Sequence, residues 1–259
     1  MRGRSFGATD IGRVRPKNED FFAVEPSLGS FAVADGLGGR RAGDAASRGA
    51  IEIMTRYLQE RLRFNSSVQK LLLGAYKVAA RYVYEISKNN PATRGAMTTL
   101  TAMLLRGGRY HIVHIGDTRA YLLRKGKLRQ ITEDHTQAQL FVKQGYLTPE
   151  EAKHHKSRNI LTKALGTRPF PKPSYYSNWV KKGDKFLLAS DGLYTHFEDE
   201  ELAEILGAYP PREAVPRLIE LANERGGDDN ITAVVVEITN PGVSWLMRVI
   251  RTLDRALRP

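Results

Sequence analysis

Four apolar segments of strand character each end at, or begin from, an aspartate flanked by glycine or by another aspartate. They are 31–34 before Asp35-Gly36, 111–115 before Gly116-Asp117, 186–190 before Asp191-Gly192, and 231–236 after Asp228-Asp229-Asn230. Carboxylates at strand ends can meet at one rim of a sheet sandwich even when they are far apart in sequence. Like charges brought together repel each other, and a raised pKa or a bound cation relieves the repulsion. The pattern therefore predicts an acidic rim with chemistry of its own, although a single Asp-Gly pair is typically only a turn.

The composition restricts which cation such a rim would hold. The chain has no cysteine, which excludes disulfides, zinc-thiolate sites and a cysteine nucleophile. Its six histidines lack the i, i+4 arrangement of a zinc-binding helix, so an oxygen-rich site favours magnesium or manganese. Asp35 is the best candidate to bridge two such ions, because the carbonyl of Gly36 beside it is unhindered. Two hard cations can activate a shared water and hold a phosphoryl oxygen.

The elements that would position these residues come in blocks, without regular alternation of strands and helices. Strands are expected at 5–9, 21–25, 30–35, 98–105, 109–115, 119–124, 174–180, 184–190 and 231–238. Helices are expected at 42–63, 66–89, 136–144, from 148 onward, at 199–207 and at 211–225. This order favours mainly antiparallel sheets with helices packed outside, an α+β fold. One domain over residues 1–239 is the expected organisation.

Two of the expected helices carry specific signals. In the second helix, apolar side chains recur at spacings of three and four and predict its buried face. These residues are Val68, Leu71, Leu72, Ala75, Val78, Ala79 and Tyr82. Thr148 has the pattern of a helix N-cap, because Pro149 follows it and Glu151 comes three residues later.

The size and charge of the chain limit the class of protein to which it belongs and the partners that it would bind. It has 259 residues and a formal net charge of +12, which favours anionic partners such as phosphoproteins, nucleic acid or an acidic membrane face. A solvated basic surface is the alternative. No run of 18 apolar residues occurs, and the first residues lack the apolar stretch of a secretory signal. We therefore expect a cytoplasmic protein.

The last residues, 240–259, differ from the rest of the chain. Asn240-Pro241-Gly242 breaks the last strand, and 243–258 has the pattern of one basic amphipathic helix. Its apolar face is Trp245, Leu246, Val249, Ile250, Leu253 and Leu257, and its basic residues are Arg248, Arg251, Arg255 and Arg258. Such a helix docks on its own domain, lies on an acidic membrane or binds a partner protein. The sequence leaves these alternatives open, including membrane association of the whole protein.

Read together, the motifs from about residue 5 to 238 give a strong family signal. They are Thr9-Asp10-Ile11-Gly12, Arg15, Asn18-Glu19-Asp20, Ala34-Asp35-Gly36-Leu37-Gly38-Gly39, Met97-Thr98-Thr99-Leu100, Gly116-Asp117-Thr118-Arg119, Thr132-Glu133-Asp134-His135-Thr136, Ala164-Leu165-Gly166, Ser190-Asp191-Gly192-Leu193 and Gly226-Gly227-Asp228-Asp229-Asn230. In this order the chain resembles the bacterial branch of the metal-dependent serine/threonine protein phosphatases of type 2C, the PPM family.

The resemblance implies a fold and a metal centre. The fold is a four-layer α/β/β/α sandwich, in which two central, mainly antiparallel sheets are flanked by helices, with a flap at about 134–168. The centre holds two Mn²⁺ or Mg²⁺ ions, with a third, weaker ion in bacterial members. The metal ligands implied by position are Asp35 as the bridge, the Gly36 carbonyl, Asp191, Asp229, Glu19, Asp20 and, for the third ion, Asp117.

The resemblance also implies an activity, the hydrolysis of phosphoserine and phosphothreonine in proteins by a metal-bridging hydroxide. Asp35 would hold the ions at the reacting centre, and the planar guanidinium of Arg15 would bind two phosphate oxygens. His135 is an alternative proton donor, although a structural role at the rim is favoured. The expected partners are phosphorylated proteins and an opposing serine/threonine kinase, with no specific nucleic acid and a monomeric chain. A regulatory binding module and a nucleic-acid binder are the rival functions.

Overall fold

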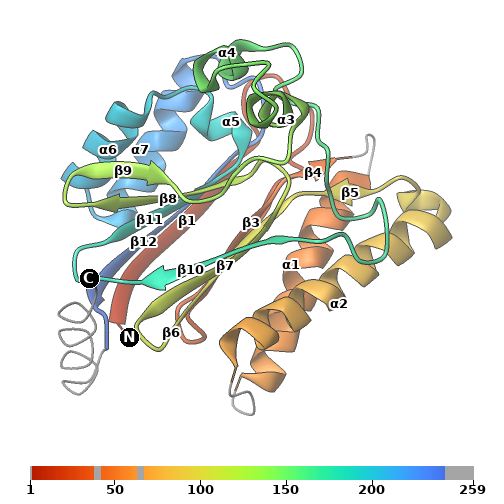
Figure 1. The fold of residues 1–259 in the computed structure, drawn as a ribbon, viewed down its shortest axis with the longest axis horizontal. Helices are drawn as coiled ribbons and strands as arrows, with labels where there is room; N and C mark the ends of the chain where they lie inside the picture. Colours follow the sequence, from red (N-terminus) through yellow and green to blue (C-terminus); the bar gives the residue numbers. More distant parts are fainter. Residues whose placement is uncertain (1, 38–41, 63–66, 243–259) are drawn as a thin grey trace.

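Two five-stranded antiparallel sheets pack face to face at the centre of the protein (Figure 1). The computed structural model describes residues 2–37, 42–62 and 67–242. The first sheet has the order β1 (Arg2–Asp10), β12 (Ile231–Asn240), β11 (Lys185–Ala189), β8 (Arg119–Arg124) and β9 (Lys127–Gln130). The second has the order β10 (Ser174–Trp179), β7 (Arg109–Ile115), β6 (Leu100–Arg106), β3 (Ser30–Ala34) and β2 (Phe21–Glu25). A short ribbon pairs β4 (Gly36–Leu37) with β5 (Met97–Thr98).

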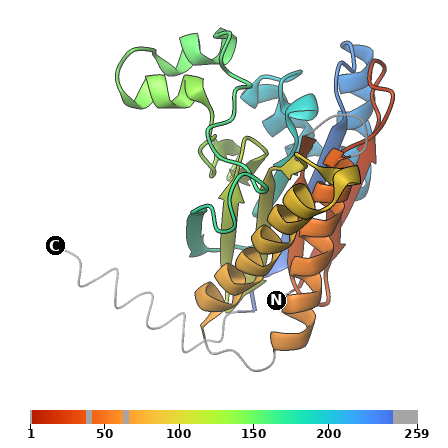
Figure 2. The same ribbon diagram turned by 90° about the vertical axis from the view of Figure 1, so that its right-hand side faces the viewer.

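Helices cover the outer face of each sheet (Figures 1 and 2). The second sheet is covered by α1 (Ala42–Arg61) and α2 (Val68–Asn89), which η1 (Pro91–Thr93) follows. The first sheet is covered by α5 (Asp191–Tyr194), α6 (Asp199–Ala208) and α7 (Pro211–Glu224). The helices α3 (Gln137–Lys143) and α4 (Pro149–His154) lie within 134–168, the predicted flap.

Three apolar clusters hold these layers together, and the strands divide their side chains among them. In β3, Ala32 and Ala34 pack toward α1 and α2, whereas Phe31 and Val33 pack against the other sheet. Successive side chains of a strand point to opposite faces, so a strand that is buried on both faces reads as a continuous apolar run. The α/β/β/α prediction is therefore confirmed.

Most predicted elements are present, and the differences have local causes. The strands β9 and β4 and the helix α5 are additional; β9 is short and mixes Lys127, Arg129 and Gln130 with one leucine, so its strand signal is weak. In α2, Val78 and Tyr82 are each 37% exposed, and Tyr76, Ala80 and Val83 are buried instead. The buried face of α2 is thus rotated relative to the predicted one.

The flap shows the local signals read from the sequence. Thr148 caps α4 in a capping box, because its hydroxyl accepts from the Glu151 N–H at 3.2 Å and its own N–H donates to the Glu151 carboxylate at 2.7 Å. An isolated bridge between Thr136 and Leu161 closes this segment on itself, and a bridge between Thr98 and Leu165 joins it to the body. No helix in the described part of the chain is long and apolar enough to cross a bilayer. The predicted helix at 243–258 lies outside the described residues, and the division at residue 239 stays a prediction.

Candidate metal centre and phosphate site

Strand ends from both sheets meet at one rim of the sandwich and bring the predicted aspartates together. Asp20 precedes β2 and Asp35 follows β3, and because Phe21 pairs with Ala34 the two carboxylates flank neighbouring strand ends. Asp191 follows β11 and Asp229 precedes β12, two strands that pair with each other. Asp117 follows β7. Neighbouring antiparallel strands run in opposite directions, so the end of one strand and the start of its neighbour lie at the same edge of the sheet.

Burial and mutual repulsion mark this rim as electrostatically unusual. Burial raises the pKa of Asp35 well above its usual value, and the charges of Asp20, Asp191 and Asp117 raise it further. Burial and the Asp229 charge raise the pKa of Asp191 to about 6. The pKa of Asp117 is raised by burial and then by Asp191. Carboxylates placed like this resist ionisation unless positive charge arrives.

Asp20 has the best-defined surroundings of the group. Its side chain is 6% exposed, and burial raises its pKa to about 7, with the charges of Asp191 and Asp229 adding to the rise. The hydroxyl of Thr232 donates to Asp20 Oδ2 at 2.6 Å and opposes that rise. The other oxygen, Oδ1, is buried without a hydrogen-bond partner, as is Oε1 of Glu19. Buried unpaired oxygens are destabilising unless a ligand meets them.

The donor set of the rim fits hard divalent cations. All its side-chain donors are carboxylate oxygens, and orphaned oxygens of Asp20 and Glu19 are available to a cation. Gly36 lies so close to Gly43 that a Cβ would be 2.2 Å from the Gly43 carbonyl oxygen, so only glycine fits here. No three Asp, Glu or His side chains within 2–37, 42–62 and 67–242 form a ready-made cage. An ion bound at this rim would therefore need the carboxylates to adjust toward it.

Arg15 lies at the same rim. Its Nη2 donates to Asp229 Oδ2 at 2.6 Å, and the two side chains are 51% and 33% exposed. The charges of Asp35 and Asp191 also act on its guanidinium. The predicted phosphate-binding arginine and the predicted metal ligands are therefore neighbours, separated by 214 positions in the sequence.

Asn230 fastens the loop that carries Arg15, a role that the sequence analysis did not assign. Its amide donates to the carbonyl oxygens of Ile11 and Lys17, both at 2.9 Å, and its Oδ1 accepts from the Glu19 N–H at 2.8 Å. Gly12 lies in this loop at φ 82°, where a Cβ would be 2.2 Å from the Asp229 carbonyl oxygen. The motif Asp228-Asp229-Asn230 was the available signal, but its amide contacts are visible only in three dimensions.

His135 supports the loop of Asp117 as a buried, neutral side chain. Its Nδ1 accepts from the Gly116 N–H at 3.2 Å, its Nε2 is 2.9 Å from the Ser174 hydroxyl, and its ring stacks on His114 at 4.8 Å. Burial lowers its pKa to about 3. Since Nδ1 must be an acceptor here, these contacts favour the structural interpretation over proton donation.

A second group that the sequence analysis missed connects the flap to the rim. Arg119 donates to both oxygens of Asp134, with its shortest contact at 2.7 Å, and its guanidinium lies 3.7 Å from the ring centroid of Tyr194. The Tyr194 hydroxyl donates to the Asp117 carbonyl oxygen at 3.1 Å. The start of the flap is thereby linked to the backbone of a predicted metal ligand.

Comparisons with known proteins identify the family of the chain. Residues 11–233 match the family described as protein phosphatase 2C. The chain is 39% identical over 236 residues to the serine/threonine protein phosphatase PstP of Mycobacterium tuberculosis, covering 90% of this chain and 44% of PstP. It is 30% identical to protein phosphatase PhpP of Streptococcus pneumoniae, covering 89% of this chain and 95% of PhpP. The chain thus spans less than half the length of the mycobacterial relative.

Solved structures show the same fold. A crystal structure of PstP from M. tuberculosis superposes with a TM-score of 0.85 at 37% identity, covering 92% of this chain and 99% of that one. The phosphatase Stp1 of Staphylococcus aureus gives a TM-score of 0.83 at 28% identity, with 93% and 96% covered. A PstP catalytic domain described in complex with two manganese ions gives 0.82 at 36% identity, with 92% and 99% covered. The chain belongs to the protein phosphatase 2C family, as the order of its motifs predicted.

Proposed function

We propose that this chain is a metal-dependent protein phosphatase that hydrolyses phosphoserine and phosphothreonine in proteins. The observation that carries the proposal is the buried rim at which five aspartates face one another's charges, with Arg15 beside them. The fold and the named relatives support the same reaction. A related domain is described with two manganese ions, and the oxygen-only donor set here suits Mn²⁺ or Mg²⁺.

The ligand roles proposed from the sequence remain consistent with the rim. The chain's own side chains supply acidic oxygens on both sides of Asp35, which is the proposed bridge, while Gly36 contributes its carbonyl. The remaining proposed ligands are Asp191, Asp229, Glu19 and Asp20, with Asp117 for a third, weaker ion. When bound, the two ions would neutralise the rim and supply an activated water as nucleophile.

Arg15 is the proposed phosphate-binding residue. Its side chain is half-exposed and lies at the edge of the acidic rim, where a phosphate ester held there would come within its reach. The planar guanidinium binds two phosphate oxygens at once and stabilises the charge that develops during transfer. The basic net charge of +12 supports phosphoprotein substrates, and an opposing serine/threonine kinase completes the proposed reaction cycle.

The test compares two adjacent aspartates. Hydrolysis of p-nitrophenyl phosphate and of phosphoserine and phosphothreonine peptides is measured with Mn²⁺, and again with excess chelator. We expect Asp229→Asn to lower kcat/KM by at least about 100-fold, as losses at metal centres typically do. Asp228→Asn is the matched control, because Asp228 is the exposed neighbour. Full activity in chelator, or equal losses in the two variants, would overturn the proposal.

A further inference from the structure

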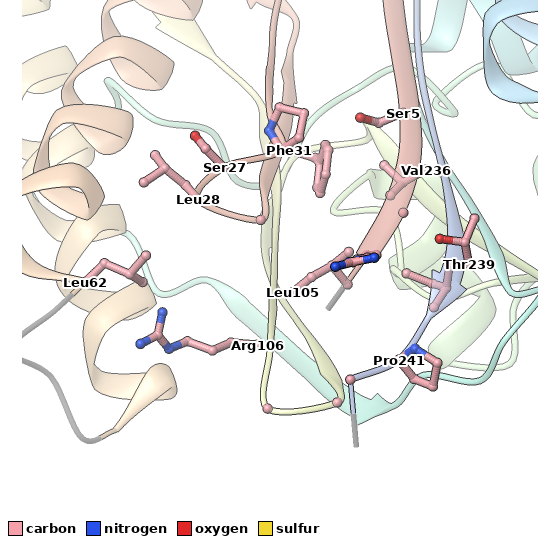
Figure 3. Close-up of a pocket in the computed structure, with 18 residues that line it drawn as sticks. Ser5, Ser27, Leu28, Phe31, Leu62, Leu105, Arg106, Val236, Thr239 and Pro241 are labelled. Atoms are coloured by element: carbon pink, nitrogen blue, oxygen red, sulfur yellow. The ribbon is translucent and has the colours of Figure 1, made fainter. Parts of the chain in front are cut away.

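A cavity of about 590 Å³ opens between the two sheets at the end opposite to the acidic rim (Figure 3). The register fixes this position, because β1 begins with Arg2 beside Asn240, whereas Asp10 at its other end lies beside Ile231. A strand of 10 residues, roughly 33 Å long, separates the two ends. The apolar side chains of the lining come from both sheets and from their connections. They are Pro26, Leu28, Phe31, Leu62, Leu105, Val236, Ile238 and Pro241.

The lining of this cavity is mixed: apolar residues lie on two facing sides, and Arg2, Ser5, Ser27, Arg106 and Thr239 lie among them. In Figure 3, Leu28 lies on one side and Val236 and Pro241 lie on the other, with Phe31 and Leu105 between them. Phe31 and Val236 are almost fully buried, at 3% and 1% exposure, and form the floor. The volume lies within the range of about 300–1,000 Å³ that is typical of ligand pockets. The cavity is therefore large enough to receive a bulky side chain from outside the described residues.

The described part of the chain ends at the mouth of this cavity. Pro241 and Gly242 line it, and residues 243–259 follow directly. Gly242 has φ 64° and its N–H donates to Asn240 Oδ1 at 2.9 Å, so the chain turns out of the direction of β12 here. Trp245 is three residues beyond Gly242, so its backbone lies within roughly 11 Å of the cavity wall whatever the local conformation.

We propose that the apolar face of residues 243–259 docks back onto this chain, with Trp245 seated in the cavity between the two sheets. Chain continuity keeps the indole near the opening of the cavity, so little additional entropy is lost when it enters. In this arrangement, the aliphatic side chains of Leu246 and Ile250 would be removed from water together with the indole of Trp245. Arg106 at the rim of the cavity is exposed, and a guanidinium packs favourably over an indole face. The proposal is independent of the phosphatase activity.

Tryptophan fluorescence tests the proposal, because the chain contains only Trp179 and Trp245. In full-length Trp179→Phe protein, free of lipid, we expect Trp245 to emit at short wavelength and to resist quenching by acrylamide. Leu28→Asp places a charge in the cavity wall and should shift the emission to longer wavelength, with several-fold stronger quenching. Leu140→Asp is the matched control, since Leu140 is 42% exposed on α3 of the flap and should leave the emission unchanged.

Alternative occupants give distinct results that overturn the proposal. Trp245 emission like that of free indole, or unaltered by Leu28→Asp, shows that the cavity does not hold it. Burial only after addition of phosphatidylserine vesicles identifies a lipid surface instead, and burial that depends on protein concentration identifies a second copy of the chain. If Leu28→Asp does not fold, Trp245→Ser gives a second measurement. Docking predicts a lower thermal midpoint for that variant, and an unchanged midpoint contradicts it.

Discussion

Removing one negative charge from the rim should stabilise the protein when no divalent ion is present. The change is Asp20→Asn, which keeps the size of the side chain and an oxygen that can accept from Thr232. Most polar substitutions at a buried position are destabilising. Here the expected sign is opposite, because ionised Asp20 is buried among other carboxylates and has an oxygen without a partner.

The magnitude follows from the pKa. The pKa of Asp20 rises from its ordinary value of 3.8 to about 7 in the folded protein. Between those values the folded state binds more protons than the unfolded state, so stability falls as the pH rises through this window. At about 1.36 kcal/mol per pH unit, the upper bound at pH 8 is roughly 4 kcal/mol. Asp20 shares its protonation with Asp35 and Asp191, so we expect Asp20→Asn to raise the free energy of unfolding at pH 8 by about 2 kcal/mol.

The assay is urea unfolding in chelator at pH 5 and pH 8, with Asp228→Asn as the exposed control. Asp20→Asn should raise the free energy of unfolding at pH 8 and have a smaller effect at pH 5. Added Mn²⁺ should then stabilise the wild type, by about 2.7 kcal/mol at 100 times its dissociation constant, and stabilise the variant less. A variant that is destabilised equally at both pH values would refute the reasoning, because hydrogen bonding and not charge would then dominate.

Three further predictions concern the loop at the rim. Arg15→Ala should lower kcat/KM for phosphopeptides by roughly 10- to 100-fold, since a charge-assisted contact is worth about 1.5–3 kcal/mol, and steady-state kinetics with Mn²⁺ would show it. An unchanged kcat/KM would remove Arg15 from the site. Asn230→Ala should destabilise the protein by about 2–3 kcal/mol in urea unfolding, because three hydrogen bonds to the loop are lost. Gly12→Ala should be more destabilising than Gly95→Ala by at least about 1 kcal/mol in thermal unfolding: both glycines have positive φ, but only Gly12 has the Asp229 carbonyl oxygen in the way. Equal thermal midpoints for the two variants would show that the backbone around Gly12 moves to admit the Cβ without a loss of stability.

The sequence predicts the rim well because its strands carry strong local signals. Strands buried on both faces read as apolar runs, and their ends are marked by Asp-Gly pairs, so β7 and β8 were predicted with the observed bounds. The capping box at Thr148 is also local, since all its partners lie within three residues. Features of this kind need no knowledge of tertiary packing.

Other features depend on contacts that the sequence does not encode locally. In α2, Tyr82 covers Gly49 of α1, where a Cβ would meet the Tyr82 ring, and remains partly exposed. Periodicity alone fixes the buried face of a helix only approximately. The amide contacts of Asn230 join segments more than 200 residues apart. The pair between Arg119 and Asp134 likewise joins the start of β8 to the segment that follows β9, 15 residues later.

Exposure separates two kinds of charge pair at this rim. Arg15 and Asp229 are 51% and 33% exposed, and pairs of this kind typically contribute at most about 1 kcal/mol. Such a pair is easily exchanged, which in the proposed site would leave the carboxylate free for a cation and the guanidinium free for a phosphate. Arg119 and Asp134 are 25% and 12% exposed and share several hydrogen bonds, so separating them would leave charges in a poorly solvated place. The weak pair therefore lies where the proposed site would take up its ligands, and the strong pair lies where the predicted flap joins the body.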